Sequence, residues 1–331
     1  MGSLSSRRSF VQTLSLLGCA LPLLTACVHD IRQRRARRIG FVIGADYPQL
    51  VAAFKEELRR LGYVEGENVV VEMRESQPNR SDLSEMCAEL ARMDLKLIVA
   101  AALSIAIEVR KANSVPMVIA TCPGMVSNGF AQTLEHPGGN VTGIDELPPG
   151  LTTKRLTLLK AAAPRVSHVA LLSTTPGHGG HEMQLADAEQ SATALGIKVV
   201  PYRATSLGEL QNALTAIVSE GMDGLLSFQG GLSLTNRQLI VDFAAKHSLP
   251  AVYQATLFTE AGGLMAWAPN LPNQFRMAAR YVDQILRGAD PGDLPIQFPP
   301  RYYLTLNAGA AKDLGLALPP ALRDLANRVV T

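Results

Sequence analysis

From residue 39 onward, short apolar runs alternate with longer stretches in which apolar side chains recur every three or four residues. The short runs predict strands at 39–43, 69–73, 97–100, 117–120 and 141–144. The longer stretches predict helices at 47–61, 79–93 and 105–111. Apolar strands that alternate with helices are typical of a parallel sheet covered on both faces. The first half of the chain is therefore expected to form one α/β lobe.

The same alternation starts again after residue 150. It predicts helices at 153–163, 180–195, 206–220 and 235–247, and strands at 166–173, 198–202, 224–228 and 251–253. The tail adds a helix at 271–286, a strand at 302–306, and helical segments at 308–314 and 320–330. Two successive series of this kind predict two similar lobes.

A tail that follows two complete lobes is expected to cross back between them, which gives several hinge strands. We therefore predict an α/β protein with two Rossmann-like lobes, parallel sheets and a multi-strand hinge. The first lobe is expected to contain residues 39–145 and 271–297. The second is expected to contain residues 146–270 and 298–331.

The first 27 residues have the features of an export signal rather than of a folded segment. Two arginines, Arg7 and Arg8, precede Phe10 and an apolar stretch at 11–24, as in twin-arginine export signals. Leu24-Thr25-Ala26-Cys27 then resembles a bacterial lipobox, in which the cysteine is lipidated and becomes the new N-terminus. The alternative is a short uncleaved N-terminal anchor. Both place the globular part outside the cytoplasm, at the periplasmic or extracytoplasmic face, tethered to a membrane.

Charge is unevenly distributed along the chain. The 331 residues carry a net charge of +2, yet residues 1–38 hold seven arginines and one acidic residue. Residues 39–331 therefore hold 24 basic and 28 acidic side chains, a net charge of −4. Five of the arginines fall in residues 28–38, which we interpret as a solvated basic linker. A mildly acidic body argues against a nucleic-acid partner.

Hydrophobic residues make up 47% of the chain, but no apolar run reaches the roughly 20 residues that span a bilayer. A multi-span membrane protein is therefore excluded. Four cysteines are present, and Cys19 and Cys27 belong to the leader. Cys87 and Cys122 remain, and an export compartment permits a disulfide between them. The sequence leaves their pairing open, although two buried free thiols are favoured.

Ligands of open parallel sheets bind beyond the carboxyl ends of the strands. The residues expected there are small, hydroxylic or amide-bearing, with one carboxylate and two aromatic rings: Asp46, Tyr47, Ser104, Thr121, Thr174, Phe228, Gln229 and Gln254. Trp267, the single tryptophan, lies near the expected lobe crossing, where it either stacks on a ligand or fills the hinge. Asp46 either binds a ligand amine or caps the following helix. This set suits capture of a small polar molecule and supplies little chemistry.

The templates for catalysis and cofactor binding are absent. No G-x-G-x-x-G follows the first strand, and neither a G-x-x-x-x-G-K-[ST] nor a G-x-S-x-G motif occurs. His178-Gly179-Gly180-His181-Glu182 differs from H-E-x-x-H and is interpreted as a surface loop rather than a metal site. We therefore expect no enzyme activity, no cofactor and no metal.

Several short segments resemble a known family when they are taken together in their order and spacing. They are Leu61–Val69, Pro137–Gly143, Gly262–Met265, Tyr281–Leu286 with Gly288, Asp293–Pro295, Leu314–Leu316 and Pro319-Pro320. They are similar to those of the substrate-binding lipoproteins of ABC transporters, the group that includes tryptophan/tyrosine-type binding proteins. The resemblance implies a type I periplasmic-binding fold whose two lobes close on a solute. It also implies delivery of that solute to an ABC permease and its ATPase.

The resemblance leaves the identity of the solute open. Amino-acid-binding relatives often carry an acidic residue just after the strand that corresponds to 224–228, where this chain has Gln229-Gly230-Gly231. We therefore expect a small polar or aromatic organic solute without naming it.

Two other functions stay open at this stage. One is a cofactor-independent two-lobed enzyme of the racemase type, which needs Cys87 and Cys122 to face one cleft. The apolar pattern around Cys87 (Leu83, Met86, Leu90) favours a packing role instead. The other is a ligand-sensing module that docks on a membrane receptor.

Overall fold

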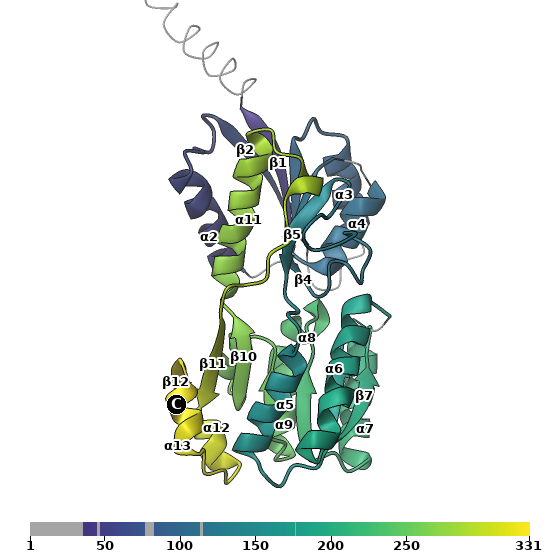
Figure 1. Cartoon of the computed structure of the whole chain (residues 1–331), viewed down its shortest axis with the longest axis vertical. Helices are drawn as coiled ribbons and strands as arrows, with labels where there is room; N and C mark the ends of the chain where they lie inside the picture. Colours follow the sequence, from purple (N-terminus) through teal and green to yellow (C-terminus); the bar gives the residue numbers. More distant parts are fainter. Residues whose placement is uncertain (1–35, 45–46, 77–82, 113–114, 176) are drawn as a thin grey trace, which may run out of the picture.

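The computed structural model describes residues 36–44, 47–76, 83–112, 115–175 and 177–331. The expected export signal, Cys27 and most of the basic linker lie outside these residues. The described chain forms two α/β lobes, one above the other in Figure 1. Among the described residues, no helix has the length and apolar character needed to cross a membrane.

The first lobe is built on a five-stranded sheet. Its strands are β1 (Arg37–Gly44), β2 (Val69–Ser76), β3 (Leu97–Ala100), β4 (Met117–Cys122) and β5 (Val141–Asp145). They lie in the order β2-β1-β3-β4-β5, and every neighbouring pair is parallel. Buried residues occupy all four positions of β3 and all five of β5, as expected for strands covered on both faces.

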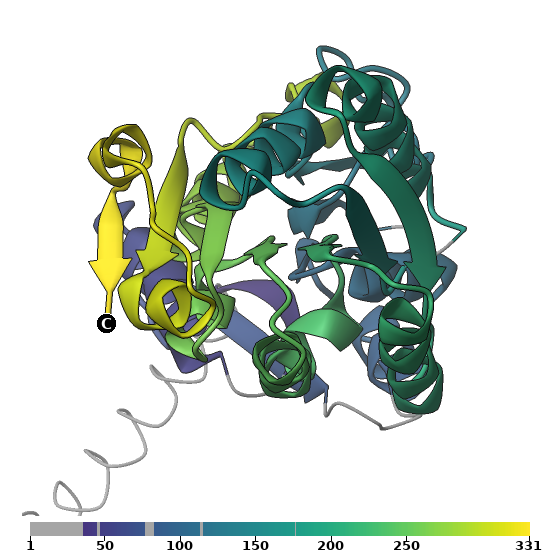
Figure 2. The same ribbon diagram turned by 90° about the horizontal axis from the view of Figure 1, so that it is seen from below.

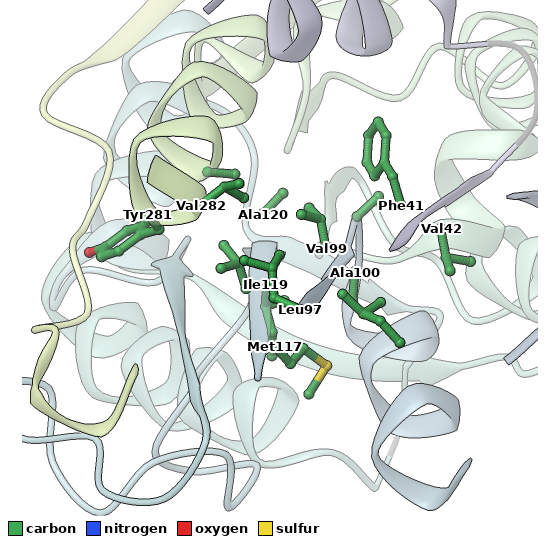
Figure 3. Packing of buried hydrophobic residues seen from close by; sticks show 14 of the residues in the cluster. Phe41, Val42, Leu97, Val99, Ala100, Met117, Ile119, Ala120, Tyr281 and Val282 are labelled. Carbon is green, nitrogen blue, oxygen red and sulfur yellow. The ribbon is translucent and has the colours of Figure 1, made fainter. Parts of the chain in front are cut away.

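Four helices cover this sheet, and one of them comes from the far end of the chain. They are α2 (Pro48–Arg60), α3 (Leu83–Ala91), α4 (Leu103–Ala112) and α11 (Leu271–Leu286). The core includes Phe41 and Phe54, whose ring centroids lie 4.7 Å apart, together with Phe275, Tyr281 and Val282 of α11. Figure 3 shows Val282 beside Ala120 of β4. Residues 275–296 thus share a core with residues 39–144.

The second lobe is built on a seven-stranded sheet. Its strands are β6 (His168–Ser173), β7 (Lys198–Arg203), β8 (Gly224–Ser227), β9 (Ala251–Tyr253), β10 (Met265–Pro269), β11 (Tyr302–Asn307) and β12 (Arg328–Val330). They lie in the order β12-β11-β10-β9-β8-β6-β7, and only the β10–β11 pair is antiparallel.

Helices lie on both sides of the second sheet (Figure 2). They are α5 (Leu151–Ala162), α6 (Gly179–Leu195), α7 (Leu207–Ser219), α8 (Gly231–Thr235), α9 (Arg237–Lys246), α10 (Thr256–Glu260), α12 (Ala308–Asp313) and α13 (Pro320–Leu325). Two hydrophobic clusters, one on each face, hold them to the strands. The expected two-lobed α/β architecture is therefore the one observed, with one antiparallel pair in an otherwise parallel second sheet.

Several expected elements differ from the observed ones. The helical segment expected over 320–330 ends at Leu325, and Arg328–Val330 forms β12 beside β11. The helix expected over 235–247 is α9 (Arg237–Lys246), and the short α8 (Gly231–Thr235) that precedes it was not expected. The segment around His178 is the start of α6 rather than a surface loop, and His181 is buried. The elements β10 and α10 were not expected at all.

Three segments of chain cross between the lobes. They are residues 146–150 between β5 and α5, Asn270 between β10 and α11, and residues 287–301 between α11 and β11. The first and third run side by side, because the backbone N–H of Asp145, the last residue of β5, donates to the Gln297 carbonyl at 3.0 Å. The Tyr302 hydroxyl also donates to the Glu146 carbonyl at 2.9 Å. The three crossings form the hinge between the two lobes.

Candidate functional site

A cavity of about 290 Å³ lies between the two lobes. Both lobes and the first crossing contribute to its lining: Ala102, Leu103, Ser104, Thr121, Pro123, Glu146, Thr174, Thr175, Gln229, Gly230, Gly231, Leu232, Leu234, Gln254, Ala255 and Leu271. Most of these residues directly follow β3, β4, β6, β8 or β9. The cavity therefore occupies the position at which parallel sheets bind their ligands.

The structure brings five of the candidate residues together in this lining. They are Ser104, Thr121, Thr174, Gln229 and Gln254. Ser104 is exposed near the start of α4, whereas Thr174, Gln229 and Gln254 are buried. Asp46 lies outside the described residues, as Cys27 does.

The three aromatic candidates are not part of the lining. Phe228 is fully buried and packs on His181, with ring centroids 5.8 Å apart. Trp267 is half-buried in β10 and stacks on Tyr302 at 6.3 Å. Tyr47 precedes α2 and packs against the first-lobe core. Among the described residues, the lining contains no aromatic ring.

A buried arginine orients the side chain of Gln229. Arg155 of α5 is fully buried, and its guanidinium donates to Gln229 Oε1 at 3.1 Å. The same guanidinium donates twice to the Trp267 carbonyl, at 3.1 and 3.0 Å. Because Gln229 Oε1 is held in this way, the amide Nε2 is left buried without a hydrogen-bond partner among the described residues. The cavity wall thus offers a hydrogen-bond donor.

The amide of Gln254 is arranged in the opposite sense. Its Nε2 donates to Ser233 Oγ at 2.9 Å. Its Oε1 is buried and has no partner in the described part of the chain. An unpaired buried polar atom costs on the order of 1–3 kcal/mol, so such atoms in a cavity wall indicate groups that a ligand completes.

Glu146 is the one charged side chain in the described lining. It follows β5 at the first crossing and is buried, and its Oε1 accepts from Gln274 Nε2 at 3.3 Å. Burial raises the pKa of this carboxyl to about 7, which outweighs the lowering of the pKa by the Gln274 hydrogen bond and by the charge of Arg155. The lining residues therefore hold two acceptor groups, Glu146 and Gln254 Oε1, and one amide donor without a partner, Gln229 Nε2.

Residues 40–330 match the family described as ABC transporter substrate binding protein. The chain belongs to this family. The match covers both lobes and all three crossings, so the cavity lies inside the matched region. The protein is the solute-binding component of an ABC transporter, and like other members of the family it is extracytoplasmic.

Individual relatives agree with this assignment. A tyrosine-binding protein from Clostridioides difficile (strain R20291) is 20% identical over 287 residues, which is 86% of this chain and 82% of the relative. The structure of an ABC domain in complex with L-Trp from Streptococcus pneumoniae is similar with a TM-score of 0.82. It is 21% identical, and the match covers 89% of this chain and 100% of that one.

A ligand-free, open substrate-binding protein from Clostridium difficile is also similar, with a TM-score of 0.66 and 22% identity. That match covers 89% of this chain and 100% of the other. At these identities the two structures establish the fold, which is the type I periplasmic-binding fold expected from the sequence.

One wall of the cavity in this substrate-binding protein is held by a second buried carboxylate. Asp145 accepts from the backbone N–H groups of Gly124 (3.0 Å), Met125 (2.7 Å) and Leu147 (2.9 Å). Burial raises the pKa of this carboxyl, and the three backbone hydrogen bonds lower it. Asp145 therefore ties the loop that begins at Pro123, a lining residue, to the first crossing.

Two features bear on the enzymatic alternative. Cys87 and Cys122 are free and buried, and neither lines the cavity. Burial raises the pKa of the Cys87 thiol to about 11 and holds that of the Cys122 thiol well above its usual value. The described residues also hold no group of three or more His, Cys, Asp or Glu side chains arranged to bind a metal ion. A two-thiol racemase mechanism therefore has no matching geometry in this cavity.

Sequence reasoning missed Glu146, Arg155 and Thr175. Glu146 directly follows a strand, so the rule that selected the other candidates applied to it as well. It was passed over because the boundary between the two expected lobes was placed between residues 145 and 146. Arg155 had no such signal, because an arginine within a helical pattern is normally assigned to the solvent face.

Proposed function

We propose that this substrate-binding protein captures a small polar organic solute in the inter-lobe cavity and delivers it to the permease of an ABC importer. The observation that carries the proposal is the pair of buried amide atoms without partners, Gln229 Nε2 and Gln254 Oε1, in the wall of one cavity. Solute groups that complete these hydrogen bonds remove the cost of two unsatisfied polar atoms. That gain is available only when the solute is bound.

The lining restricts the chemistry of the solute. A hydrogen-bond donor is needed for Gln254 Oε1 and Glu146, and an acceptor is needed for Gln229 Nε2. Leu103, Leu232 and Leu271 provide apolar surface without an aromatic ring for stacking. We therefore favour a compact solute that bears an amine or several hydroxyl groups, with an aliphatic rather than an extended aromatic body. Relatives named for tyrosine and tryptophan keep amino acids among the solutes to be tested.

The proposal includes a lipid anchor at Cys27. It is supported by the lipobox-like sequence Leu24-Thr25-Ala26-Cys27 and by the paired arginines that precede the apolar segment. Mass spectrometry of the protein isolated from the host membrane checks this part. The expected N-terminal peptide begins at Cys27 and carries acyl chains, whereas an unmodified peptide that starts upstream would contradict it.

A solute screen tests the binding function. Purified protein is heated with each member of a library of amino acids, amines, polyols and organic acids, and the unfolding temperature is recorded. A solute with a dissociation constant near 1 µM, or about −8 kcal/mol, raises that temperature clearly at millimolar concentration. Deletion of the gene is expected to slow uptake of the same solute. Absence of both effects across the library would overturn the proposal.

A further inference from the structure

The first turn of α6 in the second lobe lies directly against a loop of the first lobe. In Figure 1 the upper end of α6 reaches the first lobe, where residues 123–128 follow β4. The Gly179 backbone N–H donates to Asn128 Oδ1 at 3.1 Å. Asn128 Nδ2 in turn donates to the carbonyls of Pro123 (2.8 Å) and Gly124 (2.7 Å). One side chain therefore holds its own loop and bonds the opposite lobe.

The contact depends on two successive glycines. A Cβ atom on Gly180 would meet the Pro123 carbonyl oxygen and lie 2.6 Å from its carbon. A Cβ atom on Gly179 would meet the Ser127 carbonyl and lie 2.6 Å from Ser127 Cβ. Backbone atoms cannot yield to such contacts as the end of a flexible side chain can. The two lobes therefore reach this separation only because positions 179 and 180 have no side chain.

Backbone conformation gives no other reason for glycine at these positions. Gly179 and Gly180 are the first residues of α6 and are not among the residues with positive φ. Alanine adopts helical φ and ψ more readily than glycine does, so the sequence is locally unfavourable for the helix that it forms. The close approach of the first lobe is the feature that accounts for both glycines.

We propose that Gly179, Gly180 and Asn128, which we call the latch residues, set how far the two lobes close and thereby position the walls of the cavity. Pro123 lines the cavity, and its carbonyl group is also what a Cβ atom on Gly180 would meet. Asp145 at the first crossing holds the same loop through Gly124 and Met125. Movement at the hinge is thus carried through a fixed loop to the α6 contact.

The role of the latch residues rests on the proposed function, because closure of the lobes matters only if a solute is enclosed. The closed arrangement is populated to the extent that its extra contacts favour it, and solute contacts add to those of the latch. A methyl group at position 180 would stop the lobes before the cavity walls meet. Solute would then contact one lobe at a time and leave more quickly.

The test measures the distance between the lobes directly. Spin labels are placed on cysteines introduced at Lys111 of α4 and Glu189 of α6, both exposed, while the natural Cys87 and Cys122 are buried. Distance distributions are recorded by double electron–electron resonance with and without a small-molecule extract of the host cells as the probe. Gly180→Ala and Gly179→Ala are compared with the wild-type protein and with Gly208→Ala.

Gly208 provides the matched control, because it is also near the start of a helix, α7, and nothing lies within 4 Å of a Cβ atom placed there. The extract is expected to move wild type and Gly208→Ala to the short distance, while Gly180→Ala and Gly179→Ala stay at a distance longer by a few ångströms. The unfolding temperature of both latch variants without extract is expected to equal or exceed that of wild type, because alanine favours the helix.

Three results would overturn the proposed role of the latch residues in closure. If either variant reaches the same short distance as wild type, the glycines do not limit closure, and solute capture remains as proposed. If both variants unfold at clearly lower temperature than wild type without extract, the glycines serve folding of the chain rather than closure. If the extract moves neither wild type nor Gly208→Ala, the proposed function fails and the latch fails with it.

Discussion

Glu146 combines a buried carboxyl group with a place in the cavity wall. Its folded-state pKa of about 7 lies above the ordinary value of 4.5 for a glutamate because burial disfavours the ionised form. Ionisation therefore destabilises the folded protein. The resulting loss in the free energy of unfolding is absent below about pH 4.5 and grows as the pH rises toward 7. Above pH 7 it amounts to about 3 kcal/mol.

We expect Glu146→Gln to stabilise the solute-free protein above pH 7 and to reduce the loss of stability between pH 4.5 and 7. Denaturant unfolding at several pH values measures both effects. Glu135, which is exposed, supplies the control variant Glu135→Gln, for which little change is expected. Parallel stability curves for wild type and Glu146→Gln would contradict the assigned burial cost.

For individual residues, the sequence predicted the cavity lining from positions that follow strands, and not from the chemistry of the side chains. Ser104, Thr121, Thr174, Gln229 and Gln254 were selected because they follow strands of parallel sheets, and all five line the cavity. Phe228 was selected by the same rule but packs inward on His181. A strand buried on both faces has no alternation of polar and apolar residues, so its last residues do not reveal which way they point.

Among the elements, α11 shows how a distant segment completes the first lobe. Glu57 of α2 is buried, and its carboxylate accepts from Arg60 (2.8 Å) and from Arg280 of α11 (2.7 Å). The hydrogen bond from Arg60 is the main reason that the pKa of Glu57 falls to about 2, with Arg280 contributing. The folded-state pKa is below the ordinary glutamate value of 4.5, so the stability that ionised Glu57 contributes is present above pH 4.5 and is lost as the pH falls through about 2.

We expect Glu57→Gln to lower the free energy of unfolding at pH 7 by about 1 kcal/mol, a modest figure because both arginines are more than half exposed. The variant is also expected to lose less stability between pH 4.5 and 2. Glu56→Gln is the control, since Glu56 pairs with Arg276 of the same helix α11 but is exposed. Equal effects of the two variants would show that the burial of Glu57 does not matter.

The helix α11 was predicted from sequence with its observed bounds, whereas β12 and β10 were not predicted as strands. The apolar periodicity of 271–286 is local and strong, so it needs no knowledge of the rest of the fold. β12 has three residues, and it is held through pairing with β11 and through Asn327, whose side chain accepts from the Leu304 N–H at 3.0 Å. Such short strands exist only because a partner strand is present, and sequence patterns do not contain that information.

In the whole molecule, three crossings join two lobes whose strands end at a common cavity. The family match identifies a solute-binding component of an ABC transporter, and the solute site that we propose lies at the unpaired amide atoms of Gln229 and Gln254. The expected basic linker holds five arginines after Cys27, of which Arg37 and Arg38 are the first residues of β1 rather than part of a linker. The proposed function thus assigns two tasks to one chain, attachment to the membrane through Cys27 and capture of a solute in the cavity.

The central claim is that the cavity between the lobes holds the solute, and native mass spectrometry of a cavity-filling variant tests it most directly. Ser104 is an exposed lining residue at the second position of α4, so Ser104→Phe places a ring in the cavity without disturbing the core. Ser84 occupies the same position in α3, is also exposed and does not line the cavity, so Ser84→Phe is the control. Wild type and Ser84→Phe are expected to carry a bound small molecule that Ser104→Phe has lost. The same bound mass on all three proteins, or on none of them, would contradict the account.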